Sequence, residues 1–178
     1  MLWPLAIIFK PSCVISSLVA PYGSIGVICE SSRWLARQMR DAITSDAMVP
    51  IIELGAGYGS VTRILPETAV IVEREPKRFE YLKRNFPGRE IYDACAIKFL
   101  GDLERPSVVI SSIPSVNNHE FGNLRDAVER AQRAGKIVEL ITYTYFPHDP
   151  FSAIFPSSKM AKFVIKNIPP AFVWRYQC

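Results

Sequence analysis

Short apolar runs and amphipathic stretches alternate along most of this 178-residue chain. The apolar runs, which are rich in Ile and Val, predict strands near residues 49–54, 69–73, 89–93, 106–112 and 136–145. The stretches between them carry apolar residues at helical spacing and charged residues elsewhere. Strands that alternate with helices in this order predict an α/β fold, with a mostly parallel sheet and helices on both faces.

Capping signals set the expected ends of the helices. Ser31 or Ser32 can cap a helix that ends near residue 43, and Pro76 suits the first turn of a second helix. Asn118 can cap another helix, which Gly135 ends. After residue 146 a proline-rich loop leads to KFVIKNI and AFVWRY. These two segments predict a C-terminal antiparallel hairpin at the edge of the sheet, which brings the expected number of strands to seven.

A glycine-rich turn follows the first predicted strand, in IIELGAGYG at residues 51–59. Gly55, Gly57 and Gly59 have no Cβ, so the backbone can take positive φ and approach a ligand closely. Glu73 ends the next apolar run, 18 residues beyond Gly55, where a carboxylate can accept hydrogen bonds from both hydroxyls of a ribose. The pattern therefore predicts a bound nucleoside, although a glycine turn can also serve only to close a βα unit.

The spacing of the glycines favours S-adenosylmethionine over a dinucleotide. Dinucleotide folds place the third glycine three residues after the second, whereas here it comes two residues later. Glu53, which precedes the turn, suits the cationic methionine end of S-adenosylmethionine but not a pyrophosphate. Asp93 and Ala94 follow the third predicted strand, where the aspartate can accept from the adenine amine and the small residue leaves room for the base. Asp93 is also an ordinary candidate for a helix N-cap.

Composition is that of one compact globular domain, with 49% hydrophobic and 21% charged residues. The four cysteines lack metal-ligand spacing, so we expect reduced thiols in a cytoplasmic monomer with no metal. We expect two parts: an apolar segment over residues 1–30 and the α/β domain over residues 31–178. Prolines interrupt the first part, which predicts contact with a membrane surface rather than a membrane span.

Three arginines form a basic stripe on the first predicted helix, opposite its apolar face: Arg33, Arg37 and Arg40. Such a stripe is either an ordinary solvated surface or a contact for anionic lipid phosphates. The formal net charge of +4 is compatible with an anionic membrane. We therefore expect peripheral association with the inner face of a membrane, and no nucleic-acid partner.

Over nearly its whole length the chain resembles the bacterial phospholipid N-methyltransferases, a family within the class I S-adenosylmethionine-dependent methyltransferases. The matching segments are PYGSIGVICESSRWLARQM, IIELGAGYGSVTRIL, IVEREPKRF, DACAI, VVISSIPSV, ITYTY and KNIPPAFVWRY. The glycine turn alone matches any class I methyltransferase, but the GxxxxSSRxLA and NIPPAxVW segments are more specific. The chain departs from the family pattern at Glu30, where relatives commonly have proline.

The resemblance implies a Rossmann-like class I methyltransferase fold and methyl transfer to the amine of phosphatidylethanolamine or its methylated forms. Expected cofactor contacts are Glu53, Gly55, Ala56, Gly57, Gly59, Glu73, Arg74, Asp93, Ala94 and Ser112. Ile113 and Pro114 are expected to present the acceptor, with Ser112 and Tyr143 in catalytic positions. Tyr143 could orient the amine or favour a methylated cation through its ring face, but TYTYF is also an ordinary strand sequence.

Two other functions stay open at this stage. An rRNA adenine methyltransferase shares a similar cofactor half, but such enzymes offer Asn or Asp, prolines and a stacking aromatic residue to the flipped base. This chain has SSIPSV at that point, with neither the amide nor the aromatic residue. A protein that binds S-adenosylmethionine without catalysis also fits the cofactor residues.

Overall fold

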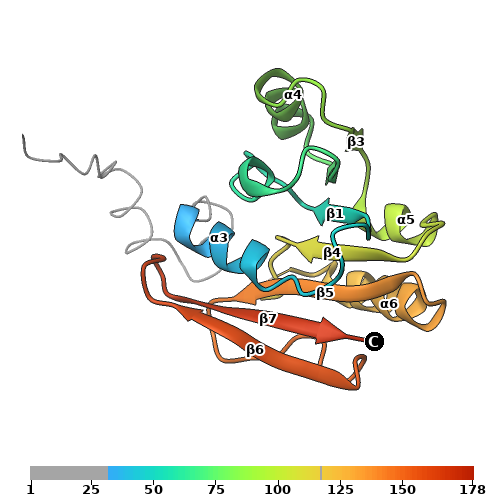
Figure 1. Ribbon diagram of the computed structural model, residues 1–178, viewed down its shortest axis with the longest axis vertical. Helices are drawn as coiled ribbons and strands as arrows, with labels where there is room; N and C mark the ends of the chain where they lie inside the picture. Colours follow the sequence, from blue (N-terminus) through green and yellow to red (C-terminus); the bar gives the residue numbers. More distant parts are fainter. Residues whose placement is uncertain (1–31, 117) are drawn as a thin grey trace, which may run out of the picture.

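The computed structural model describes residues 32–116 and 118–178, so the predicted membrane-contacting segment 1–30 lies outside the described residues. Its centre is a seven-stranded sheet in the order β3-β2-β1-β4-β5-β7-β6 (Figure 1). The strands are β1 (Ile51–Leu54), β2 (Val70–Glu73), β3 (Ile91–Asp93), β4 (Ser107–Ser111), β5 (Ile137–Thr144), β6 (Ser157–Val164) and β7 (Ala171–Gln177). The first five strands pair in parallel, whereas β7 is antiparallel to both β5 and β6. The predicted α/β fold with a C-terminal antiparallel hairpin is confirmed.

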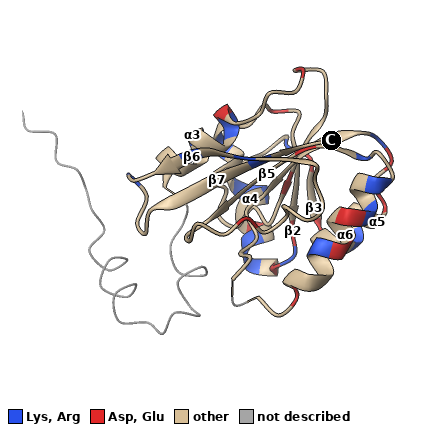
Figure 2. Cartoon of the chain, turned by 90° about the horizontal axis from the view of Figure 1, so that it is seen from below, with Lys and Arg blue, Asp and Glu red and all other residues tan. Residues whose placement is uncertain are grey.

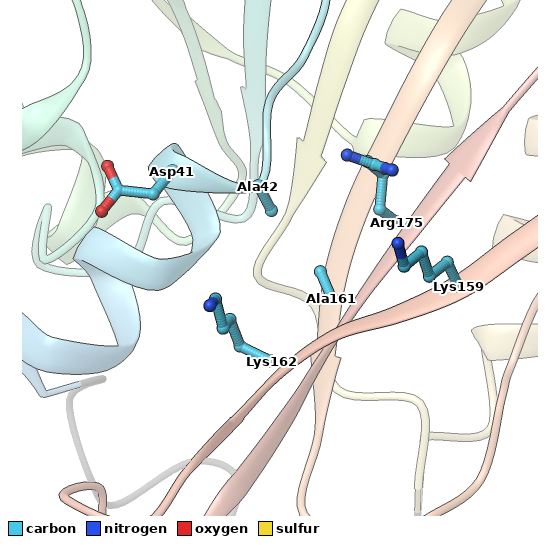
Figure 3. A pocket seen from close by; sticks show the side chains of 6 residues that line it. All are labelled: Asp41, Ala42, Lys159, Ala161, Lys162 and Arg175. Atoms are coloured by element: carbon cyan, nitrogen blue, oxygen red, sulfur yellow. The ribbon is translucent and has the colours of Figure 1, made fainter.

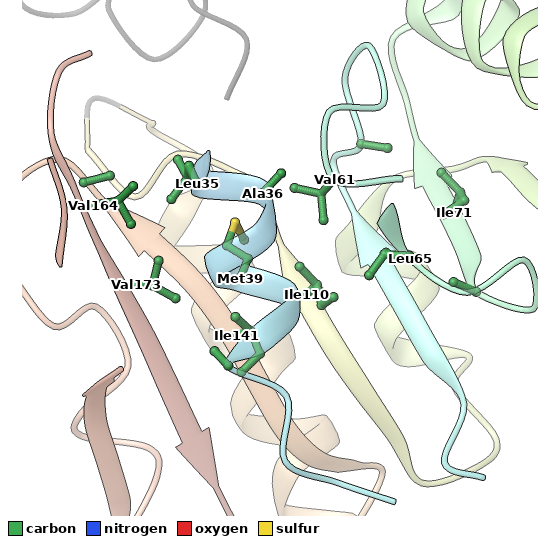
Figure 4. Close-up of a cluster of buried hydrophobic side chains, with 14 of the residues drawn as sticks. Leu35, Ala36, Met39, Val61, Leu65, Ile71, Ile110, Ile141, Val164 and Val173 are labelled. Atoms are coloured by element: carbon green, nitrogen blue, oxygen red, sulfur yellow. The ribbon is translucent and has the colours of Figure 1, made fainter. Parts of the chain in front are cut away.

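Helices cover both faces of this sheet. The elements are α3 (Arg33–Asp41), η1 (Thr62–Ile64), α4 (Pro76–Asn85), α5 (Ala96–Gly101) and α6 (Phe121–Arg133). On one face α3 packs through Leu35 and Met39 against Ile110 and Ile141 of the sheet (Figure 4). On the other face α5 and α6 pack against the opposite side chains of the same strands. Burial of each such aliphatic side chain contributes about 1.5–3 kcal/mol to the free energy of folding. The two clusters therefore stabilise the sheet from both of its faces.

Local signals explain most helix ends. The hydroxyl of Ser32 accepts a hydrogen bond from the backbone N–H of Leu35, and Pro76 is the first residue of α4, as predicted. The predicted cap at Asn118 is wrong, because α6 begins at Phe121 with Glu120 as its N-cap residue. The Asn118 side chain instead accepts from the backbone N–H of Glu120 in the turn that precedes the helix.

The strands of the hairpin also begin and end at other residues than predicted. Strand β6 begins at Ser157, before the predicted segment KFVIKNI, and ends at Val164, so residues 165–170 form the turn. The short helix α5 was not predicted, because its six residues are too few for a periodic pattern.

Charged side chains concentrate on the helices that cover the sheet. Acidic and basic residues follow one another along the outer side of α6 (Figure 2), while Leu124, Val128 and Ala131 face the core. No helix within residues 32–116 and 118–178 is both long and apolar enough to cross a bilayer.

Candidate functional site

The carboxyl ends of four parallel strands bring the predicted cofactor residues to one edge of the sheet. Leu54 of β1 pairs with Val72 of β2 on one side and with Ser111 of β4 on the other. Glu73 pairs with Asp93 at the tip of β3. Because these pairings place the ends of β1, β2, β3 and β4 level with one another, the turn that follows β1 lies between Glu73 and Ser112.

The three glycines of this turn all have positive φ, of +71° at Gly55, +59° at Gly57 and +78° at Gly59. A Cβ at Gly55 would lie 2.6 Å from Cγ1 of Ile113, and one at Gly59 would lie 2.4 Å from the ring of Phe86. A Cβ at Gly57 would meet no atom of residues 32–116 or 118–178 within 4 Å. Gly55 and Gly59 therefore allow close packing within the protein, whereas Gly57 borders the open space that a ligand can occupy.

Gly57→Ala is expected to weaken the binding of S-adenosylhomocysteine about tenfold, because its methyl group enters that open space. The left-handed backbone should also cost about 1–2 kcal/mol of stability. Gly135→Ala is the matched control, since Gly135 has φ +68° and no neighbour within 4 Å but lies after α6. Calorimetry and chemical denaturation on both variants separate the two effects, and equal affinity in the two variants would contradict a role for Gly57 at the ligand.

Glu73 ties the glycine turn to the end of β2. Its carboxylate accepts 2.8 Å from the backbone N–H of Gly57 and 2.9 Å from that of Glu75. Each carboxylate oxygen has two lone pairs, so one on each stays available. Glu73 is 4% exposed. The residue can hold the turn and accept two ribose hydroxyls at the same time.

Glu53 is fully buried at the end of β1. The hydroxyl of Thr62 donates to its Oε2 at 2.6 Å, while Oε1 is buried and has no hydrogen-bond partner among the described residues. Burial raises the pKa of the Glu53 carboxyl from 4.5 to about 8, and the Thr62 hydrogen bond lowers it only in part. A neutralised carboxyl with one unsatisfied oxygen stores an unfavourable energy that a cationic ligand group can relieve.

The predicted acceptor residues lie at the ends of β4 and β5. The hydroxyl of Ser112 is buried and has no hydrogen-bond partner within the part of the chain that the structure describes. The backbone N–H of Ser112 donates 2.9 Å to the carbonyl of Leu54. Ser111 pairs with Thr142, so the residues that follow them, Ser112 and Tyr143, are neighbours at the ends of β4 and β5. The Tyr143 ring packs edge-on against Tyr145 with centroids 5.5 Å apart. Ile113 and Pro114, both half-buried, continue the loop over Gly55.

The remaining predicted cofactor residues lie in the glycine turn itself or after strands β2 and β3. Asp93 is exposed and Ala94 is half-buried, and the backbone N–H of Ala94 donates to the carbonyl of Glu73. Ala56 is buried inside the turn. Arg74 forms an ion pair with Glu120 at the start of α6, and this hydrogen bond raises the pKa of the Arg74 guanidinium. The structure thus places Arg74 at the same edge, with its charge paired to Glu120.

Two residues outside the predicted set, Thr62 and Asn167, support the site through hydrogen bonds between separate elements. Thr62 orients Glu53 from η1. Asn167, which is 3% exposed, accepts 3.0 Å from the backbone N–H of Ser32 across 135 residues of sequence. Ser32 lies in the GxxxxSSRxLA segment and Asn167 in the NIPPAxVW segment, so the two most specific motifs of the chain meet in space.

These residues fit S-adenosylmethionine. Glu53 offers a buried oxygen without a partner for the methionine ammonium, Gly57 faces open space, and Glu73 keeps lone pairs for the ribose. Among the residues that the structure describes, no group of His, Cys, Asp and Glu side chains is arranged to hold a metal ion.

No family model matches the chain. The ornithine lipid N-methyltransferase of Singulisphaera acidiphila is 26% identical over 164 residues, which cover 83% of this chain and 85% of that protein.

Solved methyltransferase structures share the fold. TrmN from Thermus thermophilus superposes with a TM-score of 0.61 at 12% identity over 81% of this chain, which spans 48% of TrmN. The 23S rRNA methyltransferase ErmE superposes with a TM-score of 0.59 at 18% identity over 80% of this chain, which spans 66% of ErmE. The fold is the Rossmann-like fold of class I methyltransferases, as predicted. Fold and matched proteins support S-adenosylmethionine as the cofactor, in agreement with the glycine spacing.

Proposed function

We propose that this chain is an S-adenosylmethionine-dependent N-methyltransferase that methylates the amine of phosphatidylethanolamine or its methylated forms. The observation that carries the lipid acceptor is the 26% identity with an ornithine lipid N-methyltransferase over 83% of the chain. Ethanolamine and ornithine head groups both offer an amine as the methyl acceptor. The family resemblance of the GxxxxSSRxLA and NIPPAxVW segments points to the same chemistry.

The assigned roles follow from the position of each residue. S-adenosylmethionine, when bound, would supply an electrophilic methyl group for in-line attack by the deprotonated amine, with S-adenosylhomocysteine as the leaving group. Glu73 and Gly57 would hold the nucleoside end of the cofactor, and Glu53 would receive the ammonium of its methionine end. Ser112 and Tyr143, at the ends of β4 and β5, orient the amine, while Ile113 and Pro114 form the wall that excludes water.

The main alternative is methylation of RNA, because the 23S rRNA methyltransferase ErmE has a related fold. The loop after β4 reads Ser111-Ser112-Ile113-Pro114, without the amide and stacking aromatic residue that flipped adenine requires. This loop favours a small aliphatic amine over a flat base. We further propose that the protein is a monomer on the cytoplasmic face of the membrane, where its lipid acceptor is accessible.

Incubation of the full chain with labelled S-adenosylmethionine and a panel of acceptors tests the proposal. The panel contains phosphatidylethanolamine, its mono- and dimethylated forms, ornithine lipid, free ethanolamine and structured RNA. We expect label in the aminophospholipids. Label in ornithine lipid alone would mean that ornithine lipid, and not phosphatidylethanolamine, is the acceptor. Label in RNA alone would refute lipid methylation.

Tyr143→Phe is expected to lower kcat about fivefold while leaving the affinity for S-adenosylhomocysteine unchanged, as for the loss of one hydrogen bond of about 1 kcal/mol. Tyr145→Phe is the matched control, because its ring contacts that of Tyr143 on the same strand end. Steady-state kinetics on the preferred lipid compare the two variants. An equal fall of kcat in both would assign Tyr143 a packing role only.

A further inference from the structure

The tip of the β6–β7 hairpin carries an exposed apolar and basic surface next to the start of α3. This hairpin-tip surface consists of Arg33, Trp34, Arg37, Ile165, Lys166 and Ile168. Ile165 is 72% exposed, Ile168 52% and Trp34 36%. Two aliphatic side chains so exposed at one turn are unfavourable on a surface that contacts only water, and such a patch indicates a binding surface.

Cations surround the single indole ring at the centre of this surface. The Nζ of Lys166 lies 4.5 Å from the Trp34 ring centroid, and the guanidinium carbons of Arg33 and Arg37 lie at 5.5 and 5.7 Å. These two arginines belong to the predicted basic stripe, whereas the third, Arg40, is paired with Asp41. The surface is therefore strongly positive as well as apolar.

The positive charge continues from the tip along the edge strand. Residues 157–178 contain four basic side chains, Lys159, Lys162, Lys166 and Arg175, and no Asp or Glu. Three of these side chains line a hollow of about 140 Å³ between β6, β7 and the end of α3, with Asp41 across from them (Figure 3). Arg175 is 19% exposed and lies 3.9 Å from the Glu139 carboxylate, so the exposed Lys159 and Lys162 carry the positive charge that complements an anionic partner.

A buried asparagine fixes the direction of the exposed side chains. Asn167 lies between Ile165 and Ile168 in sequence and is 3% exposed. Its amide donates 2.6 Å to the carbonyl of Pro169, and its oxygen accepts from the backbone N–H of Ser32. Because Asn167 is held inward, Ile165, Lys166 and Ile168 are held outward by the folded turn.

The turn lies at the same edge of the sheet as the candidate site. Phe172 and Val173, at the start of β7, pair with Thr144 and Tyr143 at the carboxyl end of β5. In Figure 1 the β6–β7 turn projects on the side to which the arrows of β1 and β4 point. A flat partner that contacts the tip would meet the edge at which the acceptor enters.

We propose that the hairpin-tip surface docks on a bilayer that contains anionic lipid, with Ile165 and Ile168 inserted among the acyl chains. This inference rests on the proposed lipid acceptor and names the surface that brings the enzyme to it. Exposed aliphatic residues insert into the interface, Trp lies at the level of the head groups, and Lys and Arg pair with lipid phosphates. Apolar insertion and positive charge occur together here, which favours a membrane over a water-soluble anion.

Vesicle sedimentation of the full chain tests the surface without any turnover. The double variant Ile165→Ser/Ile168→Ser should partition about tenfold less onto vesicles of phosphatidylglycerol and phosphatidylcholine in equal parts. Lys166→Glu should weaken binding to these vesicles but not to phosphatidylcholine alone. The controls are Met48→Ser, which removes an 89% exposed side chain elsewhere, and Lys83→Glu on α4. Unchanged unfolding midpoints and S-adenosylhomocysteine affinity in all variants would show that the fold is intact.

The outcomes separate this inference from the proposed function. Vesicle binding that the two hairpin variants reduce and the two controls do not supports the surface, whichever acceptor the enzyme methylates. Binding equal to wild type in the hairpin variants overturns the surface, even if phosphatidylethanolamine is methylated. A concentration-dependent dimer that only the hairpin variants abolish, with vesicle binding retained, overturns it in favour of a contact between two copies of the chain.

Discussion

Glu73→Ala is expected to weaken S-adenosylhomocysteine binding about 10- to 100-fold. The variant removes the acceptor for two ribose hydroxyls. A net loss of about 1.5–3 kcal/mol, the range for a hydrogen bond to a charged group, corresponds to about 10- to 100-fold in affinity. The variant also frees the backbone N–H groups of Gly57 and Glu75, which Glu73 now holds at 2.8 and 2.9 Å. The loss of the ribose contacts lowers affinity alone, so affinity should fall more than stability.

Calorimetric titration measures this affinity, and Glu75→Ala is the control. Glu75 is the neighbouring glutamate, and its carboxylate caps α4 by accepting from Lys77 and Arg78. Its replacement should cost about 1 kcal/mol of stability and leave affinity unchanged. An unaltered dissociation constant for Glu73→Ala would remove Glu73 from the nucleoside site.

Glu53→Gln is expected to stabilise the cofactor-free protein by about 1–3 kcal/mol at pH 7 while weakening cofactor binding. Burial raises the pKa of the Glu53 carboxyl from 4.5 to about 8 in the folded protein. Between these two pH values the folded state holds a proton that the unfolded state has lost, so the unfolding free energy falls as pH rises. Each pH unit costs about 1.4 kcal/mol, and glutamine has no charge to neutralise.

Chemical denaturation at pH 5 and pH 8 checks this prediction. The stability advantage of Glu53→Gln over wild type should grow across that window. Glu139→Gln is the contrast, since Glu139 is equally buried but accepts hydrogen bonds from the backbone and hydroxyls of Thr44 and Ser45. That variant should be destabilised, because an amide group would face these donors. The same pH slope in wild type and Glu53→Gln would show that Glu53 stays ionised when buried.

The elements that could be predicted from the sequence are those with strong local signals. The five predicted parallel strands were confirmed. Four of them, β1, β2, β4 and β5, are largely apolar runs, as strands buried on both faces require, whereas β3 is an edge strand with two exposed residues. Pro76 began α4 and Gly135 followed α6, since each residue has a backbone preference that suits its place.

Tertiary contacts decided the elements that the sequence misplaced. Asn118 has the side chain of a cap, but its oxygen is used one turn earlier, where it accepts from Glu120. The exposed edge strand β6 extends back to Ser157 because β7 offers a partner along its full length, and no alternation marks its start. Asn167 closed the turn at residues where the apolar pattern had favoured strand.

Much of the candidate site followed from one motif and its spacing. Glu53, Gly57 and Glu73 meet at one edge because consecutive parallel strands end level with one another. The different roles of the three glycines could not be predicted from the motif, because they depend on contacts with Ile113 and Phe86 from distant segments. The partners Thr62 and Asn167 were also beyond reach of local patterns, because their hydrogen bonds join separate elements.

The most direct test of the central claim is methyl transfer from labelled S-adenosylmethionine to vesicles that contain phosphatidylethanolamine and phosphatidylglycerol, with equimolar structured RNA in the same reaction. Wild type should place the label in the lipid fraction as methylated phosphatidylethanolamine, and Glu73→Ala at the same protein concentration should place little there at subsaturating cofactor. Label that enters RNA and leaves phosphatidylethanolamine unmodified would contradict the account.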